Sequence, residues 1–253
     1  MKLNYKRLGE GKPFIILHGL FGSLDNWSTH QKKIAEYYDV ICVDERNHGH
    51  SPWSDEFSYD LMAEDLKELF DELQLKDAIV LGHSMGGKTA MRFAQLYPEL
   101  IEKLIVVDMG AKAYPMHHEV ILEGLNAIDL SKVHSRKEAQ EILSKYVPDF
   151  SVQQFLLKNL YWEEKEQLAW RMNIPVLEKR MPEILEALPE IENFTPTLFI
   201  RGEKSNYILE SDTAQLEAYF PDCTIVPIAN AGHWVHAEAP EVFIETVLEF
   251  CLR

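Results

Sequence analysis

Two spacings of apolar residues alternate along most of this chain. Short apolar runs rich in β-branched residues are typical of buried strands, and apolar positions three and four residues apart are typical of helices with one apolar face. Because the two alternate, the pattern indicates a wound α/β fold, with a mostly parallel sheet of roughly seven to eight strands flanked by helices. Strands are predicted over residues 14–17, 40–44, 78–81, 104–108, 197–200 and 224–228, with a weaker edge strand over 2–8. Helices are predicted over about 26–37, 62–73 and 88–97. Two more helices are predicted near the end, one that ends at Phe220 and one that begins at Pro240.

The alternation stops between residues 111 and 193. This stretch has only helical patterns, cut by Pro148, Pro175, Pro182 and Pro189, and no strand is expected in it. We therefore expect residues 1–110 and 194–253 to form the α/β core. Residues 111–193 are expected to form a helical cap, inserted after the strand that ends at Asp108.

One predicted strand turns directly into a helix at a serine. Gly82-His83-Ser84-Met85-Gly86 lies between the strand over 78–81 and the helix that follows. Such a turn leaves no room for side chains two residues on either side of the serine, and it lifts the hydroxyl clear of the backbone at the helix N-terminus. Ser84 is therefore the candidate nucleophile, and the alternative is an ordinary serine in a glycine-rich turn.

A serine hydroxyl needs a base, and the base needs a partner that fixes its tautomer. His233 follows the last predicted strand, at the sheet edge where active sites of wound folds lie. Asp108 ends the strand after the elbow, and the order Ser84, Asp108, His233 is the one expected with such an elbow. Two alternatives stay open: Asp108 could merely cap its turn, and Glu203 could be the acid.

Backbone N–H groups are expected to stabilise the oxyanion of the reaction. The N–H of Met85, directly after the nucleophile, is one candidate. The second comes from the loop that begins at His18, where Leu20 is preferred and Phe21 is the alternative.

Composition narrows the possible partners. The formal net charge of −16, without a run of Lys or Arg, disfavours nucleic acids and anionic membranes. No segment is long and apolar enough to span a membrane, and three cysteines without a C-x-x-C pair indicate free thiols in the cytoplasm. Neither a metal nor a cofactor is expected, because His48-x-His50 and His117-His118 lack a third ligand at a usual spacing.

Taken together, these motifs resemble the α/β-hydrolase superfamily and, within it, the YbfF-type esterases. The resemblance covers almost the whole chain and is carried by His18-Gly19, the run from Asp44 to Pro52, Gly82 to Lys88, and Gly232 to His236, with looser similarity at 155–160 and 170–173. It implies the α/β-hydrolase fold and hydrolysis of carboxylic esters and acyl thioesters, including acyl-CoA, with short to medium acyl chains.

The resemblance also bears on the acid. Most α/β hydrolases carry it after the strand that here ends at Ile200, where this chain has Gly202-Glu203-Lys204-Ser205. The YbfF-type group instead implies Asp108 as the acid and Ser205 as a fourth member that contacts the catalytic histidine. An ordinary turn serine is the alternative for Ser205.

The resemblance suggests a small-molecule ester or thioester as the partner and leaves the oligomeric state open. The residues expected to contact this substrate are Phe21, His83, Phe155, Trp162 and Trp234, although cap aromatics can also simply pack the cap helices together. Two other functions remain possible on the same frame: a cofactor-free haloperoxidase or C–C bond hydrolase with the same triad, and a small-molecule receptor with a slow triad.

Overall fold

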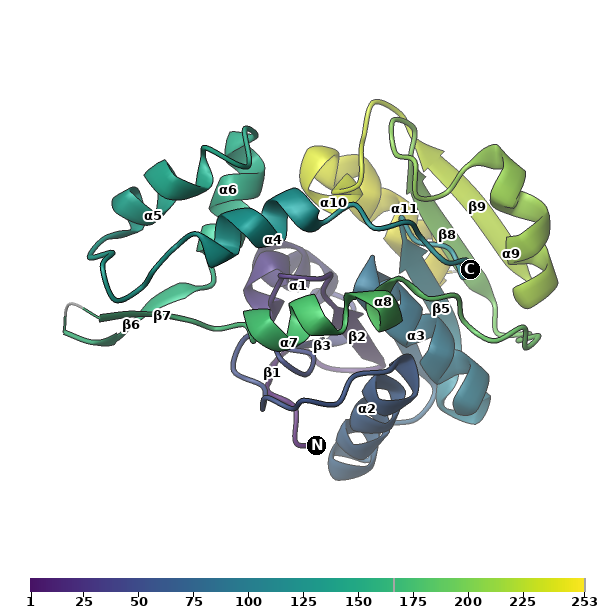
Figure 1. Cartoon of the computed structure of the whole chain (residues 1–253). Helices are drawn as coiled ribbons and strands as arrows, with labels where there is room; N and C mark the ends of the chain where they lie inside the picture. Colours follow the sequence, from purple (N-terminus) through teal and green to yellow (C-terminus); the bar gives the residue numbers. More distant parts are fainter. Residues whose placement is uncertain (166, 253) are drawn as a thin grey trace.

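The centre of the protein is a twisted sheet of seven strands, in the order β1-β3-β2-β4-β5-β8-β9 (Figure 1). The computed structural model describes residues 1–165 and 167–252. β1 pairs antiparallel with β3, and the other neighbouring strands pair in parallel, which confirms the predicted sheet and its edge strand. The strands are β1 (Tyr5–Leu8), β2 (Pro13–Leu17), β3 (Asp39–Val43), β4 (Ala78–His83), β5 (Ile101–Val107), β8 (Thr197–Gly202) and β9 (Cys223–Ile228).

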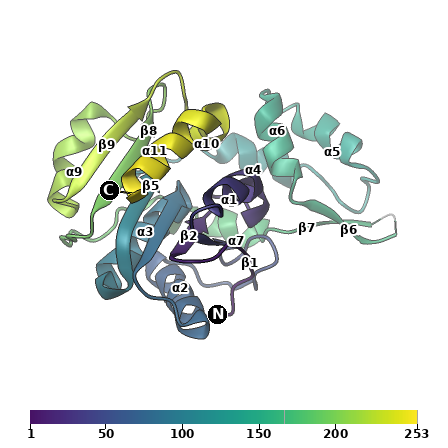
Figure 2. The same ribbon diagram turned by 180° about the vertical axis from the view of Figure 1, so that it is seen from behind.

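Helices cover both faces of the sheet, as Figures 1 and 2 show from opposite sides. One face packs against α2 (Tyr59–Leu73), α3 (Met85–Leu96) and α9 (Thr213–Tyr219). The other packs against α1 (Ser28–Ile34) and α11 (Pro240–Leu252). Shorter helical turns are η1 (Leu24–Trp27), η2 (Pro98–Leu100), η3 (Glu210–Asp212) and α10 (Val235–Glu238). The helix expected over 26–37 is thus divided between η1 and α1.

Local sequence signals set several of these boundaries. The Ser58 side chain accepts a hydrogen bond from the Leu61 N–H and so caps α2, and Pro98 follows the end of α3. Because β2, β4, β5 and β8 run in parallel, their carboxyl ends meet at one edge of the sheet. The loops at that edge carry the candidate site.

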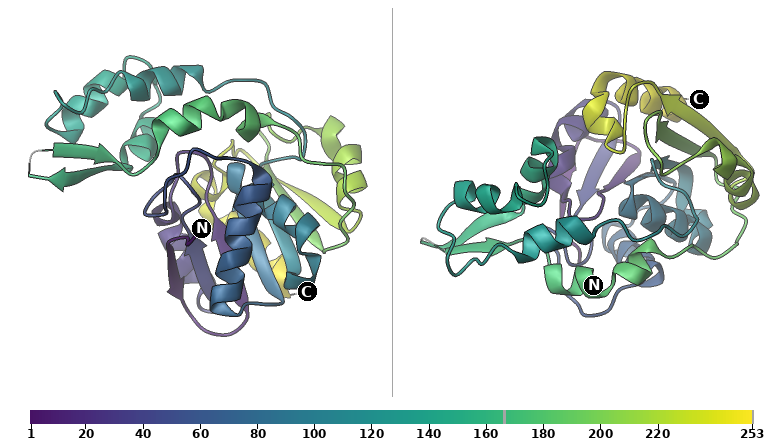
Figure 3. Two further views of the ribbon diagram at one scale, coloured as in Figure 1. Left: turned by 60° about the horizontal axis from the view of Figure 1, so that its bottom comes forward. Right: turned by 45° about the horizontal axis from the view of Figure 1, so that its top comes forward.

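The segment between β5 and β8 holds five helices and one hairpin among its described residues. β6 and β7 pair antiparallel and project away from the core in both views of Figure 3, so the expectation of no strand here was wrong. Of the hairpin residues, Leu160 and Leu168 are buried, while charged residues such as Glu164 are exposed, so the apolar alternation that marks a strand is faint. The elements are α4 (Glu119–Asn126), α5 (Arg136–Leu143), α6 (Phe150–Leu157), β6 (Leu160–Glu164), β7 (Gln167–Trp170), α7 (Ile174–Lys179) and α8 (Met181–Leu185).

The three cysteines are free thiols. Cys42 and Cys251 are buried as expected, whereas Cys223 is only half-buried in β9. Across the described ranges, no helix combines the length and apolarity needed to cross a bilayer.

Candidate active site

Ser84 stands at the turn between β4 and α3, in a backbone conformation with φ 54° and ψ −119°. The glycines on either side are required by close backbone contacts. A Cβ atom on Gly82 would lie 2.0 Å from the carbonyl oxygen of Gly86, and one on Gly86 would lie 2.4 Å from that of His18. The sequence between β4 and α3 therefore forms a strained elbow that presents the Ser84 hydroxyl at the sheet edge.

Three side chains from distant parts of the sequence form a hydrogen-bonded chain at this elbow. The Ser84 Oγ lies 3.0 Å from His233 Nε2, and His233 Nδ1 lies 2.8 Å from Asp108 Oδ2. Asp108 is completely buried directly after β5, and His233 comes from the loop after β9. The geometry fits an imidazole that accepts the serine proton at Nε2 and donates its Nδ1–H to the carboxylate.

The rival acid lies elsewhere. The Glu203 carboxylate accepts a hydrogen bond from the Asn230 N–H at 2.9 Å, and among the described residues it makes no hydrogen bond to His233. Glu203 therefore ties down the loop after β9, whereas Asp108 contacts the imidazole.

Ser205 contacts the aspartate rather than the histidine. Its hydroxyl donates a hydrogen bond to Asp108 Oδ2, the oxygen that also faces His233, while the Gly202 N–H donates to Oδ1 at 3.0 Å. Within the described ranges Ser205 has no hydrogen bond to the imidazole. The contact implied by the family resemblance is thus replaced by one to the carboxylate, because the turn after β8 brings Ser205 beside Asp108.

Two further side chains hold the His233 imidazole and its loop. The Tyr207 ring stacks on the imidazole, with ring centroids 3.8 Å apart and planes 15° apart, and His83 Nε2–H donates to the His233 carbonyl oxygen at 3.0 Å. Burial lowers the pKa of His83 well below its usual value, so this ring is neutral. Sequence reasoning missed Tyr207, because a stacking partner leaves no motif around it; its one local signal is that it follows Ser205 by two residues.

The two candidate oxyanion donors in the loop after β2 differ in whether the N–H group already has a hydrogen-bond partner. The Phe21 N–H donates to His48 Nε2 at 3.1 Å, so it is already engaged. The N–H groups of Leu20 and Met85 have no hydrogen-bond partner in the part of the chain that the structure describes. Burial lowers the pKa of His48 to about 3, and its neutral ring donates from Nδ1 to the Arg46 carbonyl and accepts at Nε2.

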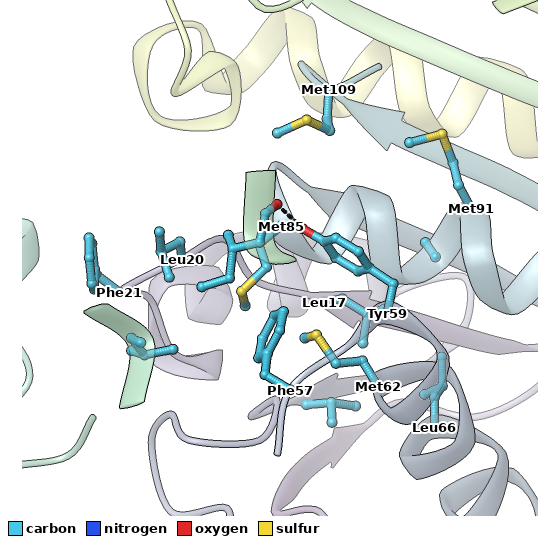
Figure 4. Close-up of a cluster of buried hydrophobic side chains, with 14 of the residues drawn as sticks. Leu17, Leu20, Phe21, Phe57, Tyr59, Met62, Leu66, Met85, Met91 and Met109 are labelled. Carbon is cyan, nitrogen blue, oxygen red and sulfur yellow. Dashed lines mark hydrogen bonds between the residues drawn. The ribbon is translucent and has the colours of Figure 1, made fainter. Parts of the chain in front are cut away.

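The side chains of this loop join the core beneath the elbow. Figure 4 shows Leu20, Phe21 and Met85 in the same apolar cluster as Tyr59 and Met62 of α2. Packing therefore supports the side chains of the loop, and the hydrogen bond to His48 holds its backbone.

A cavity of about 260 Å³ opens beside Ser84 and His233. Four of the expected substrate-contacting residues, Phe21, His83, Phe155 and Trp234, line it, and a second cavity of about 710 Å³ adjoins it between α6 and α10. Trp162 lines neither of these two cavities. It sits half-exposed on the projecting β6–β7 hairpin, so its expected substrate contact is not found.

In the described part of the chain, no group of three or more His, Cys, Asp or Glu residues is arranged so that it could hold a metal ion. One histidine of each pair considered above is engaged in other contacts. His48 is hydrogen-bonded to backbone groups, and His117 is hydrogen-bonded to Tyr207.

Comparisons with known proteins agree with this elbow and sheet. The family model described as the alpha/beta hydrolase fold matches residues 12–150. A putative esterase/lipase of Haemophilus influenzae is 39% identical over 93% of this chain and 82% of its own. The chain belongs to the α/β-hydrolase family. Esterase YbfF of Escherichia coli is 36% identical to this α/β hydrolase over 99% of each chain.

A solved structure supports the same assignment for this α/β hydrolase. The structure described as a marine microorganism esterase superposes with a TM-score of 0.96, at 40% identity, over 98% of this chain and 99% of its own. The predicted fold class is therefore confirmed, and the predicted likeness to YbfF-type esterases is confirmed with it.

Proposed function

We propose that this α/β hydrolase is a serine esterase that cleaves carboxylic esters through an acyl-enzyme at Ser84. The observation that carries the proposal is the hydrogen-bonded chain from Ser84 Oγ through His233 to Asp108. His233 Nε2 takes the hydroxyl proton as Ser84 Oγ attacks the ester carbonyl, and then gives it to the departing alcohol. A water molecule, activated by the same imidazole, releases the acid and restores Ser84.

The other site residues fit supporting roles. Asp108 keeps the proton of His233 on Nδ1, and the donors Gly202 and Ser205 keep that carboxylate in place. In our proposal the free N–H groups of Leu20 and Met85 stabilise the oxyanion of the tetrahedral intermediate. Each such donor is typically worth roughly 10²- to 10³-fold in turnover.

We also propose that residues 111–193 act as a cap over the site. Val152 and Phe155 of α6 line both cavities beside the elbow, which supports this role. The cavity of about 260 Å³ beside Ser84 suits small esters with short to medium acyl chains.

The names of similar proteins support the choice of ester chemistry. Besides the two bacterial relatives, a zebrafish (Danio rerio) protein named sn-1-specific diacylglycerol lipase ABHD11 is 36% identical over 96% of this chain and 79% of its own. Hydrolysis of acyl-CoA thioesters and a cytoplasmic location are finer parts of the proposal. The first is supported by the shared attack of serine on an acyl carbonyl, and the second by the three free thiols.

The decisive experiment replaces the nucleophile. Ser84→Ala should reduce turnover of p-nitrophenyl butyrate by roughly 10³-fold or more and abolish labelling by a fluorophosphonate probe. Ser28→Ala, at the half-buried first residue of α1, is the matched control and should behave like the wild type. Unchanged turnover in Ser84→Ala would refute the mechanism. Tight binding of esters with negligible turnover by the wild type would favour the receptor instead.

A further inference from the structure

One polar side chain of the cavity beside Ser84 lacks a hydrogen-bond partner within the described ranges. Much of the cavity wall is apolar, formed by Leu20, Phe21, Ile121, Val152, Phe155 and Leu156. Its lining also contains polar side chains, which are those of His83, Ser84, His117, His118, Tyr207, His233 and Trp234. His118 lies directly before α4, in the segment that leads from β5 to the first helix of the proposed cap.

The two adjacent histidines differ in their partners. His117 uses both ring nitrogens: Nδ1–H donates to the Pro115 carbonyl oxygen at 2.7 Å, and Nε2 accepts from the Tyr207 hydroxyl. His118 Nδ1 is enclosed without a hydrogen-bond partner. In the described part of the chain Nε2 of His118 has no hydrogen bond either, but it is not enclosed in the same way. The ring of His118 is therefore free to bind a ligand through Nε2.

The protonation of His118 follows from its surroundings. Burial, and secondarily the neighbouring His117 and His233, lower the pKa of His118 to about 3, so the ring is neutral and carries one N–H. A buried N–H without an acceptor is less well tolerated than a buried lone pair without a donor. The hydrogen consequently belongs on Nε2, and the enclosed Nδ1 is left as the bare acceptor.

The His118 ring is held in place by two other rings. It packs edge-on against Phe21, with centroids 6.3 Å apart, and lies 4.0 Å from the His117 ring. Phe21 belongs to the loop that carries the proposed oxyanion donor Leu20. A fixed donor close to this loop is well placed to act on the part of a substrate that lies next to the reacting carbonyl.

We propose that His118 is a substrate-binding residue whose Nε2–H donates a hydrogen bond to an oxygen atom of the acyl group, so that the enzyme accepts acyl chains bearing an ether, hydroxyl or keto oxygen. This inference rests on the proposed esterase function. The acyl group stays bonded to Ser84 after the alcohol has left, so the cavity that contains Ser84 is its binding place. An oxygen that enters this apolar cavity loses its water, and the His118 donor replaces the lost hydrogen bond.

The test compares two esters of equal chain length, p-nitrophenyl pentanoate and p-nitrophenyl 3-methoxypropanoate, which differ by one CH₂ replaced with oxygen. The ratio of kcat/KM for the methoxy ester to that for the pentanoate is the readout. His118→Phe keeps a ring without the donor and should lower this ratio about three- to tenfold. His118→Gln restores an N–H and should recover most of the ratio. The cavity control Ile121→Val should change both esters by a similar factor.

Failure of this inference is distinguishable from failure of the proposed function. Rapid hydrolysis of both esters with an unchanged ratio in His118→Phe would overturn the role of His118 and leave the esterase intact. Hydrolysis of neither ester would count against the esterase, and the role of His118 is then decided by binding. In the Ser84→Ala background, titration calorimetry should show the same three- to tenfold loss of relative affinity for the methoxy ester when His118 becomes Phe. An equal affinity ratio with and without His118 would refute the inference.

Discussion

Asp108 is the most constrained residue of the site. Its φ of 50° is unusual for a residue with a side chain, and both carboxylate oxygens accept hydrogen bonds. The strained turn directs the carboxylate from the end of β5 toward His233, while Gly202 and Ser205 fix it from β8 and the turn after it. Such strain persists only where the surroundings hold it, and here Gly202, Ser205 and His233 all bind the carboxylate.

Replacement of this aspartate separates it from its rival. Asp108→Asn should lower kcat for p-nitrophenyl butyrate by about 10⁴-fold, because an amide next to His233 Nδ1 favours the wrong tautomer of the imidazole. Glu203→Gln should change kcat only slightly, since Glu203 holds a backbone N–H of the loop after β9. Circular dichroism melting curves will show that both variants are folded. The opposite ranking of the two losses would move the acid to the loop after β8.

Residues with local signals were predictable, and residues defined only by tertiary contacts were not. Ser84 has an elbow of glycines around it, and Asp108 and His233 each follow a predicted strand at the same sheet edge. Tyr207 and His118 lie in irregular segments that have no periodicity, and only the folded chain brings them to the site. For the same reason, the sequence pattern could not show whether Ser205 contacts the aspartate or the histidine.

At the scale of elements, the proposed cap is joined to the core through two neighbouring segments of the chain, one that enters the cap and one that leaves it. The N–H of Tyr114 donates to the Leu185 carbonyl at 2.9 Å, and that of Leu188 donates to the Ala111 carbonyl at 2.8 Å. These bonds pair the segment that enters the cap with the segment that leaves it. Beneath them lies Lys88 of α3, four residues after Ser84.

Lys88 links the helix that follows the nucleophile to both segments. Its side chain is fully buried, and its ammonium group donates to the carbonyl oxygen of Lys112 at 2.9 Å and to that of Glu186. The ammonium also lies 5.2 Å from the centroid of the Tyr114 ring. If the cap moves relative to the core, these contacts therefore either move with it or break.

Lys88→Met, which keeps the length of the side chain, should leave the carbonyls of Lys112 and Glu186 without their donor. We expect a loss of about 2 kcal/mol in unfolding free energy and faster amide hydrogen exchange over residues 111–114 and 184–188. Lys103→Met is the matched control, because Lys103 also donates to two carbonyls, those of Phe250 and Cys251, far from the cap. Faster exchange in the cap segments of both variants alike would argue against a specific link through Lys88.

The elements of the sheet were easier to predict than those of the inserted segment. Fully buried parallel strands such as β4 are continuous apolar runs, which stand out in any sequence. The β6–β7 hairpin has few contacts with the core and buries only Leu160 and Leu168 on the strands, so its sequence lacks a strong alternation. The prediction of an all-helical insertion failed for that reason.

At the scale of the whole molecule, one buried acid couples folding to pH. Glu45 lies in the loop after β3, which also carries His48, and both of its carboxylate oxygens are enclosed without a hydrogen-bond partner among the described residues. Burial raises the pKa of Glu45 to about 8, and the nearby Asp65 carboxylate adds to the rise. The folded protein therefore keeps a proton here that the unfolded chain releases at about pH 4.5.

The sign of the effect follows from the proton count. Between about pH 4.5 and 8 the folded state binds more protons at Glu45 than the unfolded state, so stability falls as pH rises through this range. The destabilisation is absent below pH 4.5 and complete above pH 8. Because one unit of pKa corresponds to about 1.4 kcal/mol, the total loss amounts to several kcal/mol.

Glu45→Gln removes the ionisation and retains a neutral group of the same shape. Urea denaturation at pH 5, 7 and 9 should show a much smaller fall of unfolding free energy with pH in Glu45→Gln than in the wild type. Glu36→Gln, on the exposed surface after α1, should keep the pH dependence of the wild type. Since the loop of Glu45 holds the Phe21 N–H through His48, the wild type should also lose esterase activity reversibly near pH 9 before it unfolds. Parallel pH–stability curves for Glu45→Gln and the wild type would show that this carboxyl is already ionised in the folded protein.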